Sequence, residues 1–146
     1  MIKKKHIAFI VFLLFSFGNQ LFAQQNPEDI ALVENKTEDY FFEALAQRGI
    51  ENYDKAIVAI QKCLEKEPKN PAFLYELGKN QLDAKDYVAA EITFKSAVEI
   101  DNKQRWYWNG LYDVYYQTKN FDKAIGVVQK LIEFDPNMRE DLVSLY

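Results

Sequence analysis

The feature that most constrains the fold of this 146-residue chain is a side-chain pattern that recurs every 34 residues. An alanine and the aromatic residue three positions before it return together in three registers, at Ala56, Ala90 and Ala124 and at Tyr53, Tyr87 and Phe121. A fixed period of about 20–50 residues is typical of chains built from stacked structural units, each packed on its neighbours. The period therefore predicts a repeat protein.

Each unit contains two stretches whose apolar residues follow helical spacing. In the second unit, Ala90, Phe94 and Ala97 are separated by four and three positions, which places them on one face of a helix. Small residues are expected where the two helices of a unit approach most closely, at Ala44, Ala56, Gly78, Ala90 and Ala124. Larger residues are expected to fill the remaining space, at Tyr53, Phe94, Phe121 and Leu131. The pattern predicts two helices per unit and a core that is continuous along the stack.

Polar residues and prolines mark the helix boundaries. The residues that directly precede the second helix of each unit are Asn52, Asp86 and Asn120, whose side chains can accept hydrogen bonds from free backbone N–H groups. Asn70 followed by Pro71 is typical of a helix start. We expect helices of about 12–14 residues.

The 34-residue period, with paired residues such as Leu77 and Leu111 in register, resembles the tetratricopeptide repeat. The resemblance implies an all-α fold, a right-handed α-solenoid of antiparallel helix pairs, with repeats at residues 37–70, 71–104 and 105–138. Residues 24–36 are then an N-terminal linker or a short capping helix. Residues 139–146 are the start of a fourth repeat or a truncated cap.

The N-terminus has the pattern of a secretory signal peptide. Lysines at positions 3–5 precede an apolar run from Ile7 to Phe17, and a site for cleavage follows at Ala23. A membrane-spanning helix needs about 20 apolar residues, so a retained anchor is the less favoured alternative. Residues 1–23 therefore predict export, to the periplasm of a bacterial envelope or outside the cell; in a eukaryote the same signal would lead to the secretory lumen.

Composition argues against several functions. Without residues 1–23 the chain keeps 15 positive and 22 negative charges, a net charge of −7, which disfavours nucleic acid as a partner. The only histidine, His6, lies in the predicted leader, and the only cysteine, Cys63, occupies a small, buried position of the repeat. No zinc cluster or disulfide can form within one chain, and no glycine-rich phosphate loop is present. We expect no enzyme activity, no cofactor and no metal; carboxylate chemistry by Glu76 with Asp113 is the one enzymatic alternative.

The resemblance also implies a binding groove, because the first helices of tetratricopeptide repeats line the concave face that holds partner segments. The matching positions are Phe41, Leu45, Arg48, Tyr75, Glu76, Lys79, Leu82, Trp106, Asn109, Asp113 and Tyr116. We expect Trp106 and Tyr75 to be exposed there, whereas Trp108, Leu111 and Tyr115 match core positions. These eleven residues are called the predicted groove.

One subclass of the family is not expected. Members that clamp the acidic C-terminus of cytosolic chaperones carry lysine, asparagine and arginine at set positions, which here are Phe41, Leu45, Glu76, Trp106 and Gly110. Glu76 and Asp113 would repel a terminal carboxylate, so an apolar or mixed-charge segment fits better.

The C-terminal end suggests a second use of the fold. A last repeat without a polar cap leaves apolar residues uncovered, and here these form a predicted association face of Ile125, Val128, Ile132, Leu142 and Leu145. The chain is then either the front part of a longer repeat protein or is covered there by another subunit. The sequence thus favours an exported adaptor that binds a protein or peptide segment in its groove, with an assembly subunit that self-associates end to end as the alternative.

Overall fold

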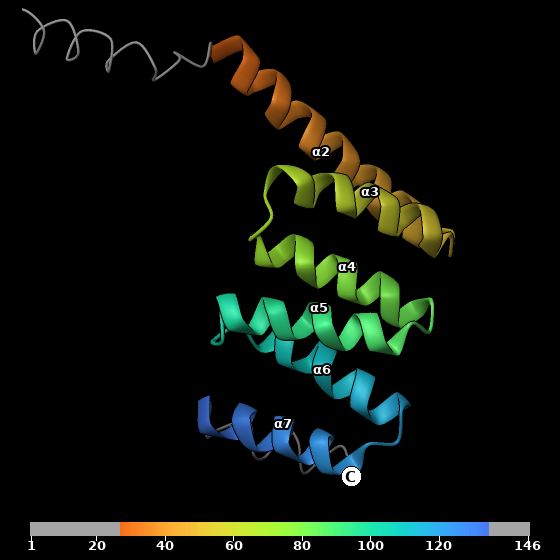
Figure 1. The fold of residues 1–146 in the computed structure, drawn as a ribbon, viewed down its shortest axis with the longest axis vertical. Coiled ribbons are helices and arrows are strands. Elements are labelled where there is room, and N and C mark those ends of the chain that lie inside the picture. The colour runs from red at the N-terminus through yellow and green to blue at the C-terminus, as the bar shows by residue number, and fades with distance from the viewer. Residues whose placement is uncertain (1–26, 135–146) are drawn as a thin grey trace, which may run out of the picture. The chain divides into compact units, whose positions relative to one another are not determined.

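The computed structural model describes residues 27–134, and every regular element in that range is a helix (Figure 1). The six helices are α2 (Pro27–Gly49), α3 (Tyr53–Lys66), α4 (Pro71–Asp83), α5 (Tyr87–Ile100), α6 (Arg105–Gln117) and α7 (Phe121–Phe134). The predicted leader and the predicted fourth-repeat start, residues 139–146, lie outside the described residues. Within residues 27–134, no helix combines the length and the apolar character needed to cross a bilayer.

The chain divides into two compact units, residues 1–34 and residues 35–146. The division falls within α2, whose first residues belong to the first unit. Residues 27–36, placed by the sequence in a linker or a short capping helix, are the N-terminal part of α2.

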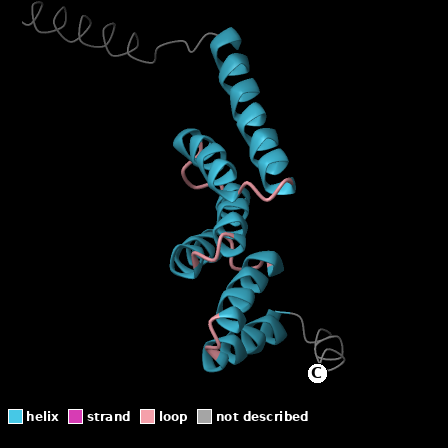
Figure 2. Ribbon diagram, turned by 90° about the vertical axis from the view of Figure 1, so that its right-hand side faces the viewer, coloured by secondary structure: helices cyan, strands magenta, loops and turns pink. Residues whose placement is uncertain are grey.

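From α3 to α7, each helix packs against the next one in the chain, and α4 also packs against α6. Figures 1 and 2 show these helices stacked one after another and joined by short loops. The first helices of adjacent repeats are therefore neighbours, as in an α-solenoid, and the predicted all-α fold is confirmed.

The core follows the repeat. All five small residues predicted at helix contacts are buried: Ala44, Ala56, Gly78, Ala90 and Ala124. Among the residues whose burial is described, the largest completely buried side chain is Phe94, which joins α5 to α4 and α6. Phe121 is a correction: it was expected to fill the core, but 54% of its surface is exposed.

Each first helix ends in the same backbone turn. Glu51, Lys85 and Lys119 are 34 residues apart and have positive φ angles of 60°, 65° and 58°. In each turn the N–H group of the next residue donates a 2.8 Å hydrogen bond back to the helix, to the carbonyl oxygens of Gln47, Gln81 and Tyr115. The left-handed turn is thus a repeated element of this fold, although none of the three positions holds glycine.

The predicted caps of the second helices are confirmed at two places. Asp86 accepts a hydrogen bond from the Ala89 N–H at 3.1 Å, and Asn120 accepts one from the Lys123 N–H at 3.4 Å. Asn52 lies at the cap position of α3, but its side chain makes no capping bond there. The type of residue before a helix therefore predicts the boundary better than it predicts the bond.

Candidate functional site

The inner face of the stack is the surface of α4, α6 and the C-terminal end of α2. Two contacts hold its parts together: the rings of Tyr75 on α4 and Tyr107 on α6 are 5.7 Å apart, and Arg48 of α2 binds Asp83 at the end of α4. The predicted groove residues lie on these three helices. As binding residues they remain a prediction.

Tyr75 occupies the centre of the inner face. It is half-buried, less open than expected, with its ring 6.0 Å from that of Phe94 and with the Lys79 ammonium 5.1 Å above it. Burial raises the pKa of the Tyr75 hydroxyl, and the nearby charges of Glu76 and Asp113 raise it further. Groups from α4 and α6 therefore share one electrostatic environment.

Most charges around Tyr75 are paired. Lys79 binds Glu76 on the same helix at 3.1 Å. The Nε and Nη2 atoms of Arg48 both donate to one oxygen of Asp83, at 2.9 and 2.8 Å. Asp113 makes no hydrogen bond or ion pair with any residue in the described part of the chain. Its side chain reaches solvent, yet the protein atoms around it displace enough water to raise the pKa of the Asp113 carboxyl.

A stripe of side chains runs along the inner surface of α6. Trp106, Asn109, Asp113 and Tyr116 follow one another by three, four and three positions, so they share one helix face. Trp106 is 59% exposed and Tyr116 is 53% exposed. The exposure predicted for Trp106 is confirmed, and its position puts a large aromatic surface in contact with water at the start of the stripe.

In the aromatic run at the start of α6, the residue that the structure buries is not the one that the sequence predicted. Tyr107, which the sequence did not assign to the core, is 7% exposed, as deep as the predicted core residues Leu111 and Tyr115. Trp108 is only half-buried, and its indole N–H donates to the Asn102 carbonyl at 2.8 Å. Tyr107 is therefore a core residue, and only a part of Trp108 remains in contact with solvent.

At the other end of the inner face the predicted groove is more closed. Phe41 is half-buried against Phe73, with ring centroids 5.6 Å apart, and Leu82 packs on the core around Phe94. Leu45 is exposed. The open aromatic surface of the inner face thus lies on α6.

An apolar hollow of about 340 Å³, called here the α6–α7 hollow, adjoins the end of this stripe. Its lining is Tyr112, Tyr116, Phe121, Ala124, Ile125, Val128 and Gln129. The rings of Tyr112 and Tyr116 are stacked 6.0 Å apart, and Ile125 is 56% exposed. The hollow joins Tyr116 of the predicted groove to Ile125 and Val128 of the predicted association face. Ile132 is half-buried and does not line it, and Leu142 and Leu145 lie outside the described residues.

The hollow arises from a change of side-chain size between repeats. In the second repeat, Phe94 fills the space beside Gly78. The third repeat has Tyr112 and Val128 at the corresponding positions, 34 residues later. Val128 is too small to occupy the volume that Phe94 fills, and the ring of Tyr112 lies in the wall instead. The sequence analysis did not predict the hollow.

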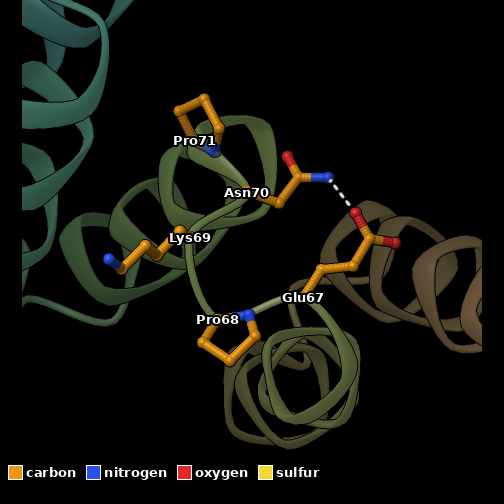
Figure 3. A pocket seen from close by; sticks show the side chains of 5 residues that line it. All are labelled: Glu67, Pro68, Lys69, Asn70 and Pro71. Carbon is orange, nitrogen blue, oxygen red and sulfur yellow. Dashed lines mark hydrogen bonds between the residues drawn. The ribbon is translucent and has the colours of Figure 1, made fainter. Parts of the chain in front are cut away.

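Two further features carry no binding chemistry. A hollow of about 660 Å³ beside the α3–α4 connection is lined by five consecutive residues, 67–71, and Figure 3 shows the Asn70 amide bound to Glu67, at 2.8 Å. Asn70 also caps α4, because its side chain accepts from the N–H groups of Ala72 and Phe73, as predicted. This hollow is the outer surface of a turn.

Cys63 is completely buried, and its thiol donates to the Thr37 carbonyl oxygen at 3.4 Å. Burial raises the pKa of the Cys63 thiol, and Glu67 adds to the shift. A thiol without contact to solvent and with little thiolate is unreactive. The expectation of a packing role is confirmed.

The fold and the inner face define an all-α repeat protein. Residues 45–111 match the family model described as "Tetratricopeptide repeat". The family match, the 34-residue period and the likeness to solved tetratricopeptide domains support a tetratricopeptide repeat protein with several repeats.

A sequence relative is the N-terminal acetyltransferase A complex subunit-like protein C418.02 of Schizosaccharomyces pombe, 32% identical over 85 residues. The match covers 58% of this chain, and the chain spans only 12% of that relative's length. It therefore compares only a part of each protein.

Two solved structures share the fold. The first tetratricopeptide domain of Spaghetti (RPAP3), bound to the HSP90 peptide SRMEEVD, has a TM-score of 0.64 at 17% identity, covering 70% of this chain and 82% of that one. The Sgt2 domain from Aspergillus fumigatus has a TM-score of 0.64 at 21% identity, covering 77% and 69%. At these identities the likeness concerns the fold.

Proposed function

We propose that this protein is an adaptor that binds a segment of a partner protein on its inner face. The observation that carries the proposal is the exposed aromatic surface of α6, where Trp106 and Tyr116 face water on one side of the helix instead of joining the core. Exposed aromatic side chains in a concave surface are typical anchors of protein interfaces. Tetratricopeptide neighbours that bind peptides support a protein-interaction role.

The partner segment is proposed to differ from the acidic peptide of the RPAP3 complex. That peptide, SRMEEVD, carries three acidic residues. Among the described residues, Asp113 on the inner face has no ion-pair partner, and the cations beside Tyr75 are already bound to Glu76 and Asp83. An apolar or mixed-charge segment suits this surface better than a terminal carboxylate does.

The adaptor is further proposed to be exported and to work in a complex of the cell envelope. The support is the leader pattern of residues 1–23. Mass spectrometry of the protein recovered from expressing cells tests this point: a mature N-terminus at Gln24 is expected, and an intact Met1 in a cytosolic fraction would contradict it.

No catalytic step belongs to the proposal. The sole histidine, His6, falls in the proposed leader, and Glu76, one of the two acids considered for catalysis, is bonded to Lys79. Neither general-base chemistry nor a nucleophile is needed to hold a partner segment.

Capture from an envelope extract tests the adaptor function. The bait is the wild-type chain, compared with a double variant, Tyr75→Ala with Trp106→Ala, and with Val88→Ala as a matched control. Val88 is on α5 and is 73% exposed, so its removal alters apolar surface away from α6. Specific partners should be lost from the double variant and kept by Val88→Ala. Equal capture by all three baits would refute groove binding.

The alternative, an assembly subunit, is favoured by one observation, the 56% exposure of Ile125 on the last described helix. Light scattering over a concentration series separates the two. An adaptor stays monomeric, whereas an assembly subunit shows a mass that rises with concentration and falls back in Ile125→Asp or Val128→Asp.

A further inference from the structure

We propose that the α6 stripe and the α6–α7 hollow together recognise a partner segment that carries a basic side chain beside a large apolar one. Asp113 is the contact for the lysine or arginine, and the hollow receives the apolar side chain. The inference rests on the proposed function, because it specifies the chemistry of the segment that the inner face binds.

The preference for a basic side chain in the partner segment is inferred from the distribution of charge on the inner face. Glu76 and Asp83 each have a cation within 3.1 Å, whereas Asp113 has no such partner in the described part of the chain. Trp106 lies two turns earlier on the same face, and an exposed indole ring attracts a cation through its electron-rich face. The whole chain has a net charge of −4, which favours approach of a basic segment.

The preference for an apolar side chain in the partner segment is inferred from the α6–α7 hollow. Its volume of about 340 Å³ is at the lower end of ligand pockets, which are about 300–1,000 Å³. Among the described residues of the lining, Gln129 is the one amide and the others are aromatic or aliphatic. Asp113 precedes Tyr116 by three residues, so the two side chains lie on the same face of α6, and the Tyr116 ring forms part of the wall of the hollow. An apolar residue in the hollow therefore brings a neighbouring lysine or arginine near Asp113.

The apolar surface around Ile125 is found in the third repeat but not at the corresponding position of the second. The counterpart of Ile125 is Glu91, whose carboxylate accepts hydrogen bonds from Lys95, Tyr115 and Lys123 at 2.7 to 3.1 Å. That site is satisfied within the chain. In the third repeat an exposed isoleucine replaces the acid, and together with the hollow it forms an apolar surface that suits an apolar partner.

The experiment is a selection of random linear peptides displayed on phage, with the complete wild-type chain as target. Enriched peptides should carry lysine or arginine within a few positions of leucine, isoleucine, methionine or phenylalanine. The best peptide is then synthesised with a fluorophore, and its affinity is measured by anisotropy. Its own lysine→glutamine and leucine→serine versions should each bind about tenfold more weakly.

Matched variants of the protein locate the two contacts. Asp113→Asn and Ile125→Asp should each weaken binding about tenfold or more, and high salt should weaken binding by the wild type more than binding by Asp113→Asn. Glu99→Gln makes the same change as Asp113→Asn at an exposed site on α5 and should leave the affinity unchanged. Circular dichroism confirms that each variant is folded, and Asp113 and Ile125 are exposed enough for both changes to be tolerated.

Other outcomes overturn the inference in distinguishable ways. Peptides that lose affinity with the Tyr75→Ala, Trp106→Ala double variant but not with Asp113→Asn or Ile125→Asp would refute this inference and leave the adaptor function standing. Enrichment of acidic peptides would also refute this inference without refuting the adaptor function. Absence of any enriched peptide, or binding that ignores all these residues, would refute both. A dimer that is dissociated by Ile125→Asp would assign the hollow to a second copy of the chain.

Discussion

Gly110 of α6 lies directly against the ring of Phe94, since a Cβ atom added to this glycine would be 2.4 Å from Cε1 of the ring. Gly78 of α4 faces the same ring, with a distance of 2.7 Å for the same atom. Two glycines, in adjacent repeats, thus make room for the side chain that joins three helices. The packing of the second repeat on the third depends on the absence of two methyl groups.

Replacing Gly110 by alanine should therefore lower the free energy of unfolding by about 1–3 kcal/mol, the usual cost of overpacking a core. Gly126→Ala is the matched control. It also changes a helical glycine, but its added Cβ meets no atom within 4 Å, so a gain of about 0.5–1 kcal/mol is expected from helix propensity. Urea denaturation measures both. Equal stabilities of the two variants would contradict the contact with Phe94.

At the left-handed turn of Lys85, a substitution is expected to raise the free energy of unfolding instead of lowering it. A non-glycine residue at a φ of 65° is strained, so Lys85→Gly should raise the free energy of unfolding by about 0.5–1 kcal/mol. Lys103→Gly, in a loop without positive φ, should lower it by a similar amount because glycine gains more entropy on unfolding. Thermal melts of the two variants should move in opposite directions; a decrease for both would argue against strain at Lys85.

The caps differ in a way that mutation can detect. Asn70 accepts two backbone hydrogen bonds at the start of α4, so Asn70→Ala should cost about 1 kcal/mol of stability. Asn52 makes no side-chain capping bond, and Asn52→Ala should cost less than half as much. Chemical denaturation of the two variants side by side provides the comparison. A larger loss at Asn52 would show that its side chain is bonded after all.

Glu91 predicts how stability depends on pH. The hydrogen bond from Lys95, together with those from Lys123 and Tyr115, lowers the pKa of the Glu91 carboxyl from 4.5 to about 2 in the folded protein. Because the folded pKa is the lower one, this carboxylate stabilises the fold above pH 4.5 and the contribution disappears as the pH falls towards 2.

Glu91→Gln should consequently reduce stability near pH 7 by about 1 kcal/mol, since its lysine partners are half exposed and screened. It should also flatten the loss of stability between pH 4.5 and 2. Glu133→Gln, which removes an exposed ion pair with Lys130, should change neither quantity measurably. Unfolding curves across this pH range would contradict the account if wild type and Glu91→Gln lost stability in parallel.

The helices could be predicted from the sequence because each position of the pattern occurs in three repeats, and the three residues can be compared. Ala56, Ala90 and Ala124 recur at a fixed spacing, and only a buried helix contact requires a small residue each time. Side chains that depart from the repeat were harder to place. Phe121 follows the aromatic pattern yet is 54% exposed, because the repeat register does not determine how much of a side chain the neighbouring helices cover.

The candidate site was predicted less completely. The repeat register located Trp106 and Asp113 on the inner face, but it does not reveal which acid lacks a cation, since the pairing of Arg48 with Asp83 joins residues 35 positions apart. The α6–α7 hollow depends on two coupled substitutions, Tyr112 and Val128, on different helices. The hollow could have been predicted by comparing Gly78 and Phe94 with the residues 34 positions later, where a small residue becomes large and a large one becomes small.

Tryptophan quenching tests the central claim, that a partner segment lies on the inner face, most directly. The chain has two tryptophans, so Trp108→Phe leaves Trp106, 59% exposed on α6, as the only indole reporter. With the captured partner or the selected peptide bound, quenching of Trp106 by acrylamide should fall severalfold and its emission should shift to shorter wavelength. Unchanged quenching of Trp106 at saturating partner would place binding elsewhere and contradict the proposed function.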